Sequence, residues 1–340
     1  MNGEPSLSNT SKAGLASGSL IAGRYEVIAE LGRGGMSVVY LCVEKMLDRQ
    51  VAVKLFNLLE GENYFLDRFQ KEARAISALS HPNIVKVFAS GIDGQHPYIV
   101  MEYLSGETLE DVLKLGPLMP DRFMSIFAVV CDAVIHAHEQ QIIHRDLKPA
   151  NIMLAKSGDT GSGAVKILDF SVAKILSDDP TMDKTIGLAG TPYYMSPEQC
   201  TGAPLDARSD VYSLGCLMYE CITGIRPFEG DSSFKILYGH MHEPVPPFAD
   251  HGHSKLYSKE LKALIQKCLS KKPDDRPQHV AQVKQNLESY STVQTSAGSL
   301  VTAAITTSAA QTTIASSFQT PGAVLRAPGS SLHNRRDFFA

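Results

Sequence analysis

The hydrophobic pattern changes character once along the chain, and this change limits the folds that the chain can adopt. Residues 24–104 contain short β-branched runs such as YEVIAELG, VVYLCVEK and VAVKLF, separated by turn signals. One stretch at about 63–79 interrupts them, because its apolar residues recur at helical spacing. From Leu109 onward the pattern is helical. Further helices are predicted over residues 121–140, 207–224 and 258–270.

We therefore predict an α+β fold in two lobes: a small β-rich lobe with one key helix, and a larger α-helical lobe. The structured domain is predicted over 21–290, divided into 21–104 and 105–290. A cleft between two lobes is a natural site for a small ligand. The Ser- and Gly-rich residues 1–20 are predicted to be disordered, and the Ser/Thr/Ala-rich residues 291–340 to form a flexible tail.

Composition and charge exclude several classes of protein. The chain has 340 residues and a net charge of −4, without a compact Lys/Arg run, so nucleic acid is not the expected partner. No run of about 18 apolar residues exists to span a bilayer, and the N-terminus has no apolar core of a signal peptide. The six cysteines contain no C-x-x-C pair, which favours free thiols and a cytoplasmic location.

A glycine-rich turn, LGRGGMSVVY at residues 31–40, lies between two strand patterns. Glycines allow the backbone amides of a hairpin to approach phosphate oxygens. A strand follows the turn, so it does not match the dinucleotide-binding pattern, in which a helix follows. Taken alone, the turn is better explained as an ordinary hairpin, because glycine-rich hairpin turns are common.

Two charged residues lie next to apolar patterns, one at the end of a strand and one beside the apolar stripe of a helix. Lys54 ends the apolar strand VAVK, and Glu72 lies beside the apolar stripe of the helix predicted at 63–79. Each alone would be an ordinary surface or snorkelling residue. Together they form a testable pair, because a lysine aimed at phosphate needs a carboxylate to orient it.

The segment IIHRDLKPANIML, residues 142–154, carries many polar residues between two apolar runs. It places an acid, a lysine and an amide, Asp146, Lys148 and Asn151, within six residues. Asp169 ends another apolar strand, VKIL. Carboxylate and amide oxygens at strand ends can hold Mg²⁺ beside a nucleotide, since Mg²⁺ takes few carboxylates together with phosphate oxygens.

In this order the motifs resemble the catalytic domain of the eukaryotic-like (Hanks-type) serine/threonine protein kinases, over residues 24 to about 288. The segments GGMS, HPNIV and MSPEQ are similar to sequences of the bacterial branch of that family. The resemblance implies transfer of the γ-phosphate of ATP to Ser/Thr hydroxyls in signal transduction. It implies ATP and Mg²⁺, with Mn²⁺ as a substitute. The partners would be protein substrates and the chain itself, through autophosphorylation.

The resemblance also implies a role for each matching residue. Lys54 would contact the α- and β-phosphates and be held by Glu72. Asp146 would orient the substrate hydroxyl and accept its proton, while Lys148 would steady the γ-phosphate. The ligands of Mg²⁺ would be Asn151 and Asp169.

The implied ATP site combines the glycine-rich turn with the connector between the lobes. Met101 would be the gatekeeper, and the backbone of Glu102 and Leu104 would bind adenine. The full set is Leu31, Gly32, Arg33, Gly34, Gly35, Val39, Ala52, Lys54, Met101, Glu102, Leu104 and Met153.

Further matches imply structural roles. Glu198 would pair with Arg276, and Asp210 would accept backbone N–H groups of the catalytic loop, which lies in the segment IIHRDLKPANIML. An apolar spine would consist of Ile76, Phe88, His144 and Phe170.

Regulation is implied for the segment between Asp169 and Glu198. Thr181 and Thr185 are the candidate phosphate acceptors, and Thr185 is favoured because it is closer to GTPYY. Arg145 directly precedes Asp146 and could pair with the added phosphate.

Two alternatives remain open at this point. A pseudokinase or scaffold is suggested by Ser171, which replaces the usual glycine after Asp-Phe, and by Ser37, which replaces the third glycine of the turn. A small-molecule phosphotransferase would share the phosphate chemistry. The motif SPE, Asp210 and Arg276 argue against a small-molecule phosphotransferase, because they resemble the peptide-binding and loop-anchoring parts of protein kinases.

Overall fold

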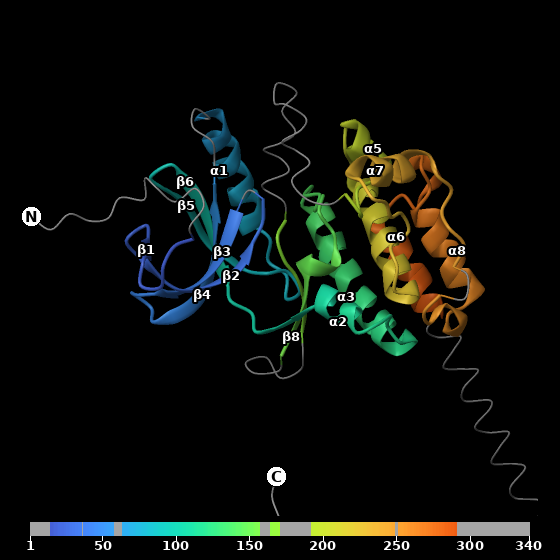
Figure 1. Cartoon of the computed structure of the whole chain (residues 1–340), viewed down its shortest axis with the longest axis horizontal. Helices are drawn as coiled ribbons and strands as arrows, with labels where there is room; N and C mark the ends of the chain where they lie inside the picture. The colour runs from blue at the N-terminus through green and yellow to red at the C-terminus, as the bar shows by residue number, and fades with distance from the viewer. Residues whose placement is uncertain are drawn as a thin grey trace, which may run out of the picture. The chain divides into compact units, whose positions relative to one another are not determined.

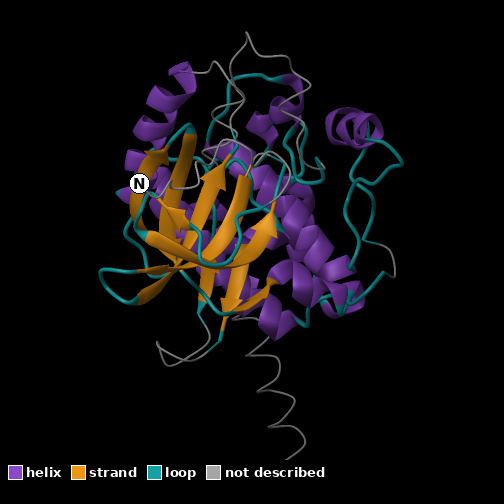
Figure 2. Ribbon diagram, turned by 60° about the vertical axis from the view of Figure 1, so that its left-hand side comes forward, coloured by secondary structure: helices purple, strands orange, loops and turns teal. Residues whose placement is uncertain are grey.

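Two lobes follow one another along the chain in the computed structural model (Figure 1). The first contains a β-sheet and one helix, drawn in blue to teal, and the second is mostly helical, drawn in green to orange. Figure 2 separates the same parts by colour, with strands in orange and helices in purple. The predicted two-lobed α+β fold is therefore confirmed. The structure describes residues 14–35, 37–57, 63–156, 164–170, 192–248 and 251–290.

The first lobe is built on a six-stranded antiparallel sheet with the order β1-β2-β3-β4-β6-β5. The helix α1 lies between β4 and β5 in the sequence. The bounds are β1 Leu20–Ile21, β2 Tyr25–Arg33, β3 Ser37–Glu44, β4 Arg49–Phe56, α1 Asn63–Ser77, β5 Val87–Asp93 and β6 His96–Glu102.

The strand β4 is buried on both faces, and its two faces serve different cores. Because side chains alternate along a strand, Val51 and Val53 pack into a cluster with Val38 and Tyr40 of the neighbouring strand β3. Ala52 lies on the opposite face, in a core that continues into the second lobe. The alternation places Lys54 on this second face, toward the rest of the molecule.

Residues that precede the predicted domain boundary at residue 21 are bonded to the sheet of the first lobe. The backbone N–H of Leu15 donates to the hydroxyl of Tyr40 at 3.0 Å, and the N–H of Gly18 donates to the carbonyl of Val27 at 2.8 Å. Leu15 also packs against the Tyr40 face of the sheet. A Ser/Gly-rich composition concealed this attachment because it rests on backbone groups and one leucine. Residues 1–13 lie outside the described residues, as do 291–340.

Phe88 does not belong to the predicted apolar spine. Its strand β5 pairs Val87 with Met101 and then Ala89 with Val100, so Phe88 is the extra residue of a β-bulge. Its ring packs on the opposite face of the sheet, with the guanidinium of Arg49 4.0 Å from the ring centroid. Val87 packs instead against the core that the two lobes share.

The second lobe begins with a small antiparallel sheet of order β7-β8-β9, followed by helices. Residues 280–290 form a last helix. The bounds are β7 Gly106–Thr108, α2 Leu109–Lys114, α3 Pro120–Glu139, η1 Pro149–Asn151, β8 Ile152–Ala155, β9 Val165–Ile167, α5 Pro197–Thr201, α6 Ala207–Thr223, α7 Ser233–His242, η3 Ser254–Leu256, α8 Lys259–Cys268 and η4 Pro273–Asp275.

The helix α6 is the centre of this lobe, since every residue from 209 to 223 is buried. A helix that is buried all round needs well-defined ends. The side chain of Asp206 accepts from the N–H of Arg208 at 2.8 Å at one end. Gly224 ends the other in the left-handed conformation, with φ of 76°. In the described part of the chain, no helix has the length and apolar content needed to cross a membrane.

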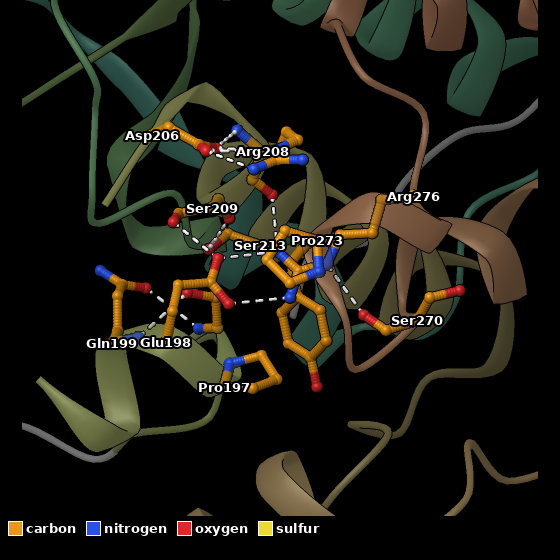
Figure 3. Close-up of polar contacts among 12 residues, drawn as sticks. Pro197, Glu198, Gln199, Asp206, Arg208, Ser209, Ser213, Ser270, Pro273 and Arg276 are labelled. Carbon is orange, nitrogen blue, oxygen red and sulfur yellow. Dashed lines mark hydrogen bonds and ion pairs between the residues drawn. The ribbon is translucent and has the colours of Figure 1, made fainter. Parts of the chain in front are cut away.

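A buried ion pair fixes α5 to the rest of the lobe, as predicted for Glu198 and Arg276 (Figure 3). The guanidinium of Arg276 donates to both carboxylate oxygens of Glu198, at 2.7 and 2.8 Å. The hydroxyl of Ser209 donates to the same carboxylate at 2.7 Å. Burial alone would raise the pKa of Glu198, but the bonds from Arg276 and Ser209 lower it below its usual range.

We expect Glu198→Ala to lower the free energy of unfolding by about 3 kcal/mol or more, because it leaves the charge of buried Arg276 without its partner. The matched control is Asp274→Ala, which removes the ion pair of Arg208 with a carboxylate whose side chain is 89% exposed. That change should stay within about 0.5 kcal/mol. Urea unfolding measures both, and equal losses would contradict the assignment.

Candidate active site

The catalytic loop, which joins α3 to β8, is bound by the carboxylate of Asp210 on α6. One oxygen accepts from the backbone N–H of His144 at 2.8 Å and the other from that of Arg145 at 2.9 Å. The Nε2 atom of His138 lies 2.8 Å from the same carboxylate. Burial alone would raise the pKa of Asp210, but the bond to His138 and the N–H of His144 lower it. This confirms the predicted bracing role of Asp210.

Two residues of the site have backbone conformations that are rare outside glycine. Arg145 has φ of 65° and Asp169 has φ of 55°. Such left-handed conformations cost about 1–2 kcal/mol each for a residue with a side chain. They persist where surrounding bonds determine them, and Arg145 is held by Asp210 in this way. Arg145 adjoins the predicted catalytic Asp146, and Asp169 is itself a predicted Mg²⁺ ligand.

The structure brings together the three polar residues predicted from the catalytic loop. Lys148 Nζ lies 2.7 Å from the Asp146 carboxylate. The side-chain amide of Asn151 donates to the Asp146 carbonyl at 2.8 Å and to its carboxylate at 3.1 Å. Asn151 in turn is only 7% exposed. A carboxylate that is fixed by a lysine and an amide is oriented for binding a hydroxyl.

Lys54 of the first lobe forms an ion pair with Asp169 of the second. Phe170, the next residue, packs on the ring of His144 with centroids 4.5 Å apart. Burial lowers the pKa of His144, which keeps the imidazole neutral. Its Nε2 lies 3.0 Å from the Leu168 carbonyl, the position of a donated bond. The segment that carries Asp169 is therefore anchored to the catalytic loop.

The expected pairing of Lys54 with Glu72 is not made in this structure. Among the described residues, the ammonium of Lys54 is paired with Asp169 rather than with Glu72, which is half-buried on α1. The physical reason is that a buried ammonium needs one carboxylate, and Asp169 supplies it here. The sequence identified both carboxylates but could not rank their distances from Lys54.

Four of the residues predicted for the ATP site belong to one apolar core or pack against it. Ala52 of β4 pairs with Met101 of β6, and both belong to the core shared by the lobes. Val39 and Leu104 pack against that core while half-buried. Met153 is half-buried on β8, the middle strand of the small sheet. Leu31, at the end of β2, is 46% exposed.

The glycine-rich turn joins β2 to β3, and Gly34 donates its N–H to the carbonyl of Ser37 at 2.8 Å. Ser37 is the first residue of β3 and pairs with Phe56 of β4. Its φ is not among the positive values. A serine therefore fits where the family motif has glycine, because the backbone at this position is extended. Arg33 forms an ion pair with Glu30 at 2.6 Å.

Sequence reasoning missed the polar contacts that link the connector, the segment between α1 and β5, and the strand β9. The side chain of Glu102 accepts from the N–H of Lys86 at 2.8 Å and from Lys166 Nζ at 2.5 Å. Asn83 donates its side-chain amide to the carbonyl of Val165 at 2.8 Å. The only signals in the sequence were the polar residues Asn83 in HPNIV and Lys166 in VKIL. Neither reveals a partner that lies 82 or 64 residues away along the chain.

Three residues named from the sequence lie outside the described residues. These are Ser171, Thr181 and Thr185. Arg145, the predicted partner of a loop phosphate, is placed directly before Asp146 and is half-buried.

Relatives named as kinases match most of the chain. Serine/threonine-protein kinase PknB of Mycolicibacterium smegmatis is 44% identical over 276 residues, which cover 78% of this chain and 43% of that protein. PknB of Mycobacterium tuberculosis is 42% identical over 278 residues, covering 79% and 43%. The chain thus spans less than half the length of these curated relatives.

The fold is also that of a solved kinase domain. The crystal structure of the Mycobacterium tuberculosis PknI kinase domain is similar with a TM-score of 0.61 and 25% identity, covering 82% of this chain and 100% of that one. A family model described as the protein kinase domain matches residues 25–287. The chain therefore belongs to the protein kinase family.

Proposed function

We propose that the chain is an ATP-dependent protein-serine/threonine kinase that transfers the γ-phosphate of ATP to Ser/Thr hydroxyls of proteins in signal transduction. The observation that carries this proposal is the contact between the lobes at Lys54 and Asp169. It places a cation and a carboxylate beside the Phe170–His144 contact that leads to the catalytic loop. The names of the relatives support Ser/Thr specificity.

The residues of this site have separate tasks in the proposed reaction. Asp146 orients the acceptor hydroxyl and takes its proton, with its carboxylate fixed by Asn151. Lys148 lies beside it and neutralises charge on the γ-phosphate. Lys54 binds the α- and β-phosphates. Because the transition state of phosphoryl transfer is loose, positioning and neutralisation supply most of the catalysis.

The donor set suits a hard divalent cation. Asp169 offers carboxylate oxygens and Asn151 an amide oxygen, and Mg²⁺ prefers such oxygens together with phosphate oxygens and water. Asn151 already donates its N–H groups to Asp146, which leaves the amide oxygen as its remaining donor atom toward a metal. We propose Mg²⁺, with Mn²⁺ as a substitute. The ion would neutralise phosphate charge and hold the nucleotide in place.

The pseudokinase alternative has no positive support. Lys54, Asp146, Asn151 and Asp169 are all present and in contact with a partner in the same site. Ser37 occupies an extended strand position, where glycine is not required. We propose proteins with Ser/Thr acceptors, and the chain itself, as substrates, and a cytoplasmic location.

We expect Asp146→Asn to lower phosphate transfer from ATP to a generic basic protein by a factor of about 100 or more, because it removes the oriented carboxylate. The control Asp121→Asn makes the same chemical change at an exposed position in the first turn of α3. Radiolabel transfer with phosphoamino-acid analysis is the measurement. Transfer that survives in Asp146→Asn, or that reaches mainly tyrosine, would contradict the proposal.

Glu72→Gln should lower kcat about tenfold or more if Lys54 exchanges Asp169 for Glu72 during turnover. It should change the free energy of unfolding by less than about 1 kcal/mol, because no Lys54–Glu72 pair is present in the structure. The control is Lys71→Gln, an exposed neighbour on α1. Steady-state kinetics and urea unfolding on the same samples decide the matter, and an unchanged kcat would remove Glu72 from the catalytic set.

Incubation of the purified chain with Mg-ATP should add phosphate at Thr185, at Thr181 or at both, because Arg145 offers a cation beside the catalytic loop. Peptide mass spectrometry locates the phosphate, and Asp146→Asn serves as the inactive control. If a basic protein is phosphorylated while the peptides that contain both threonines stay unmodified, this regulatory hypothesis is wrong.

A further inference from the structure

Gln199 on α5 makes two kinds of hydrogen bond with opposite ends of its side chain. Its side-chain oxygen accepts from the backbone N–H of Ser196 at 3.0 Å, while the backbone N–H of Gln199 donates to the Ser196 hydroxyl at 3.3 Å. This is the capping box of α5. A capping box needs only a side-chain oxygen at this position, so glutamate would serve as well. The cap therefore leaves the side-chain nitrogen of Gln199 without explanation.

That nitrogen is bound to the catalytic loop. The Nε2 atom of Gln199 donates to the backbone carbonyl of Arg145 at 2.8 Å, across 54 residues of sequence. Arg145 directly precedes Asp146 and has the left-handed φ of 65°. Its N–H is already held by Asp210 at 2.9 Å. Gln199 thus binds the backbone carbonyl of Arg145, and Asp210 binds its backbone N–H, so both backbone polar groups of this strained residue are held.

The carbonyl of Arg145 and the N–H of Asp146 belong to the same planar peptide group. That N–H lies 3.3 Å from Nδ1 of His144, the acceptor nitrogen when Nε2 carries the hydrogen. Both polar groups of this peptide plane are therefore bound, one by Gln199 and one by His144. Fixing the plane fixes the N–Cα bond of Asp146, and Asn151 holds the carbonyl on the other side of that residue, so the direction in which the Asp146 side chain leaves the backbone is constrained from both sides.

The support of this bond is rigid. Glu198, the residue before Gln199, is held by the buried Arg276 and by Ser209 of the central helix α6 (Figure 3). A displacement of α5 would therefore be transmitted to the Arg145 carbonyl. Misplacement of a catalytic group by about 1 Å can cost about a factor of 100 in rate.

We infer that Gln199 is a positioning residue for Asp146, acting through the hydrogen bond from its side-chain amide to the carbonyl of Arg145. This inference rests on the proposed kinase activity, because it concerns the orientation of the proposed catalytic carboxylate. It requires an amide at position 199, whereas the helix cap alone does not.

The central test compares Gln199→Glu with Ser196→Ala. Gln199→Glu keeps an oxygen for the capping box but replaces the donor by a carboxylate that faces the Arg145 carbonyl. Ser196→Ala removes the hydroxyl of the cap and leaves the amide of Gln199 in place. We expect Gln199→Glu to lower kcat about tenfold or more with KM for ATP within about twofold. Ser196→Ala should lower the melting temperature but keep kcat within about threefold.

A pH series adds a readout that a merely structural role would not move. A protonated carboxyl group can donate a hydrogen bond, whereas a carboxylate cannot. The ratio of kcat for Gln199→Glu to that of the wild type should therefore rise as the pH falls from about 8 to about 5, toward the carboxyl pKa. Thr201→Val, an exposed change in the same helix that leaves the loop untouched, should show a flat ratio near one.

The outcomes separate this inference from the proposed function. If the wild type transfers no phosphate to a basic protein, the proposed function fails. If the wild type is active and Gln199→Glu keeps kcat within about threefold, or if Ser196→Ala loses as much kcat, the inference is overturned. Should Gln199→Glu fail to fold, Gln199→Met removes the same donor, and its kcat is then compared with that of Ser196→Ala by the same criterion.

Discussion

The geometry of the active site depends on one buried carboxylate. Asp210 is completely buried and binds two successive N–H groups of the catalytic loop, those of His144 and Arg145. A carboxylate that binds two adjacent donors can stabilise a backbone conformation that the chain would otherwise avoid. Its charge persists because His138 lowers the pKa that burial would raise. Since Asp210 lies on the central helix α6, the loop is positioned from the interior of the lobe.

The second constraint is that the site combines side chains from two lobes. The pair of Lys54 and Asp169 depends on where β4 stands relative to β9. The segment after α1 is attached to β9, because the N–H of Val85 donates to the carbonyl of Ile167 at 2.9 Å. Glu102 strengthens this attachment by binding Lys166. The connection between the lobes is therefore fixed near β9, whereas α1 holds Glu72 without an ion pair to Lys54 in this structure.

The elements and the polar residues of the site could be predicted because their signals are local. The helix predicted over 121–140 is observed at Pro120–Glu139, and that over 207–224 at Ala207–Thr223. Periodicity and caps determine these bounds within a few residues of sequence. The pairing of Glu198 with Arg276 and the bracing role of Asp210 followed from family resemblance, since 78 and 66 residues separate the partners.

What could not be predicted depends on register and on the choice between similar partners. A single extra residue in β5 moved Phe88 to the other face, and no propensity indicates which residue of a strand will bulge. Lys54 had two carboxylates available, and their distances follow from the placement of α1 and β9. The same holds for Gln199, whose spacing from Ser196 predicts the bond of its oxygen but not that of its nitrogen. A local motif accounts for one end of such a side chain, and the tertiary fold decides what the other end binds.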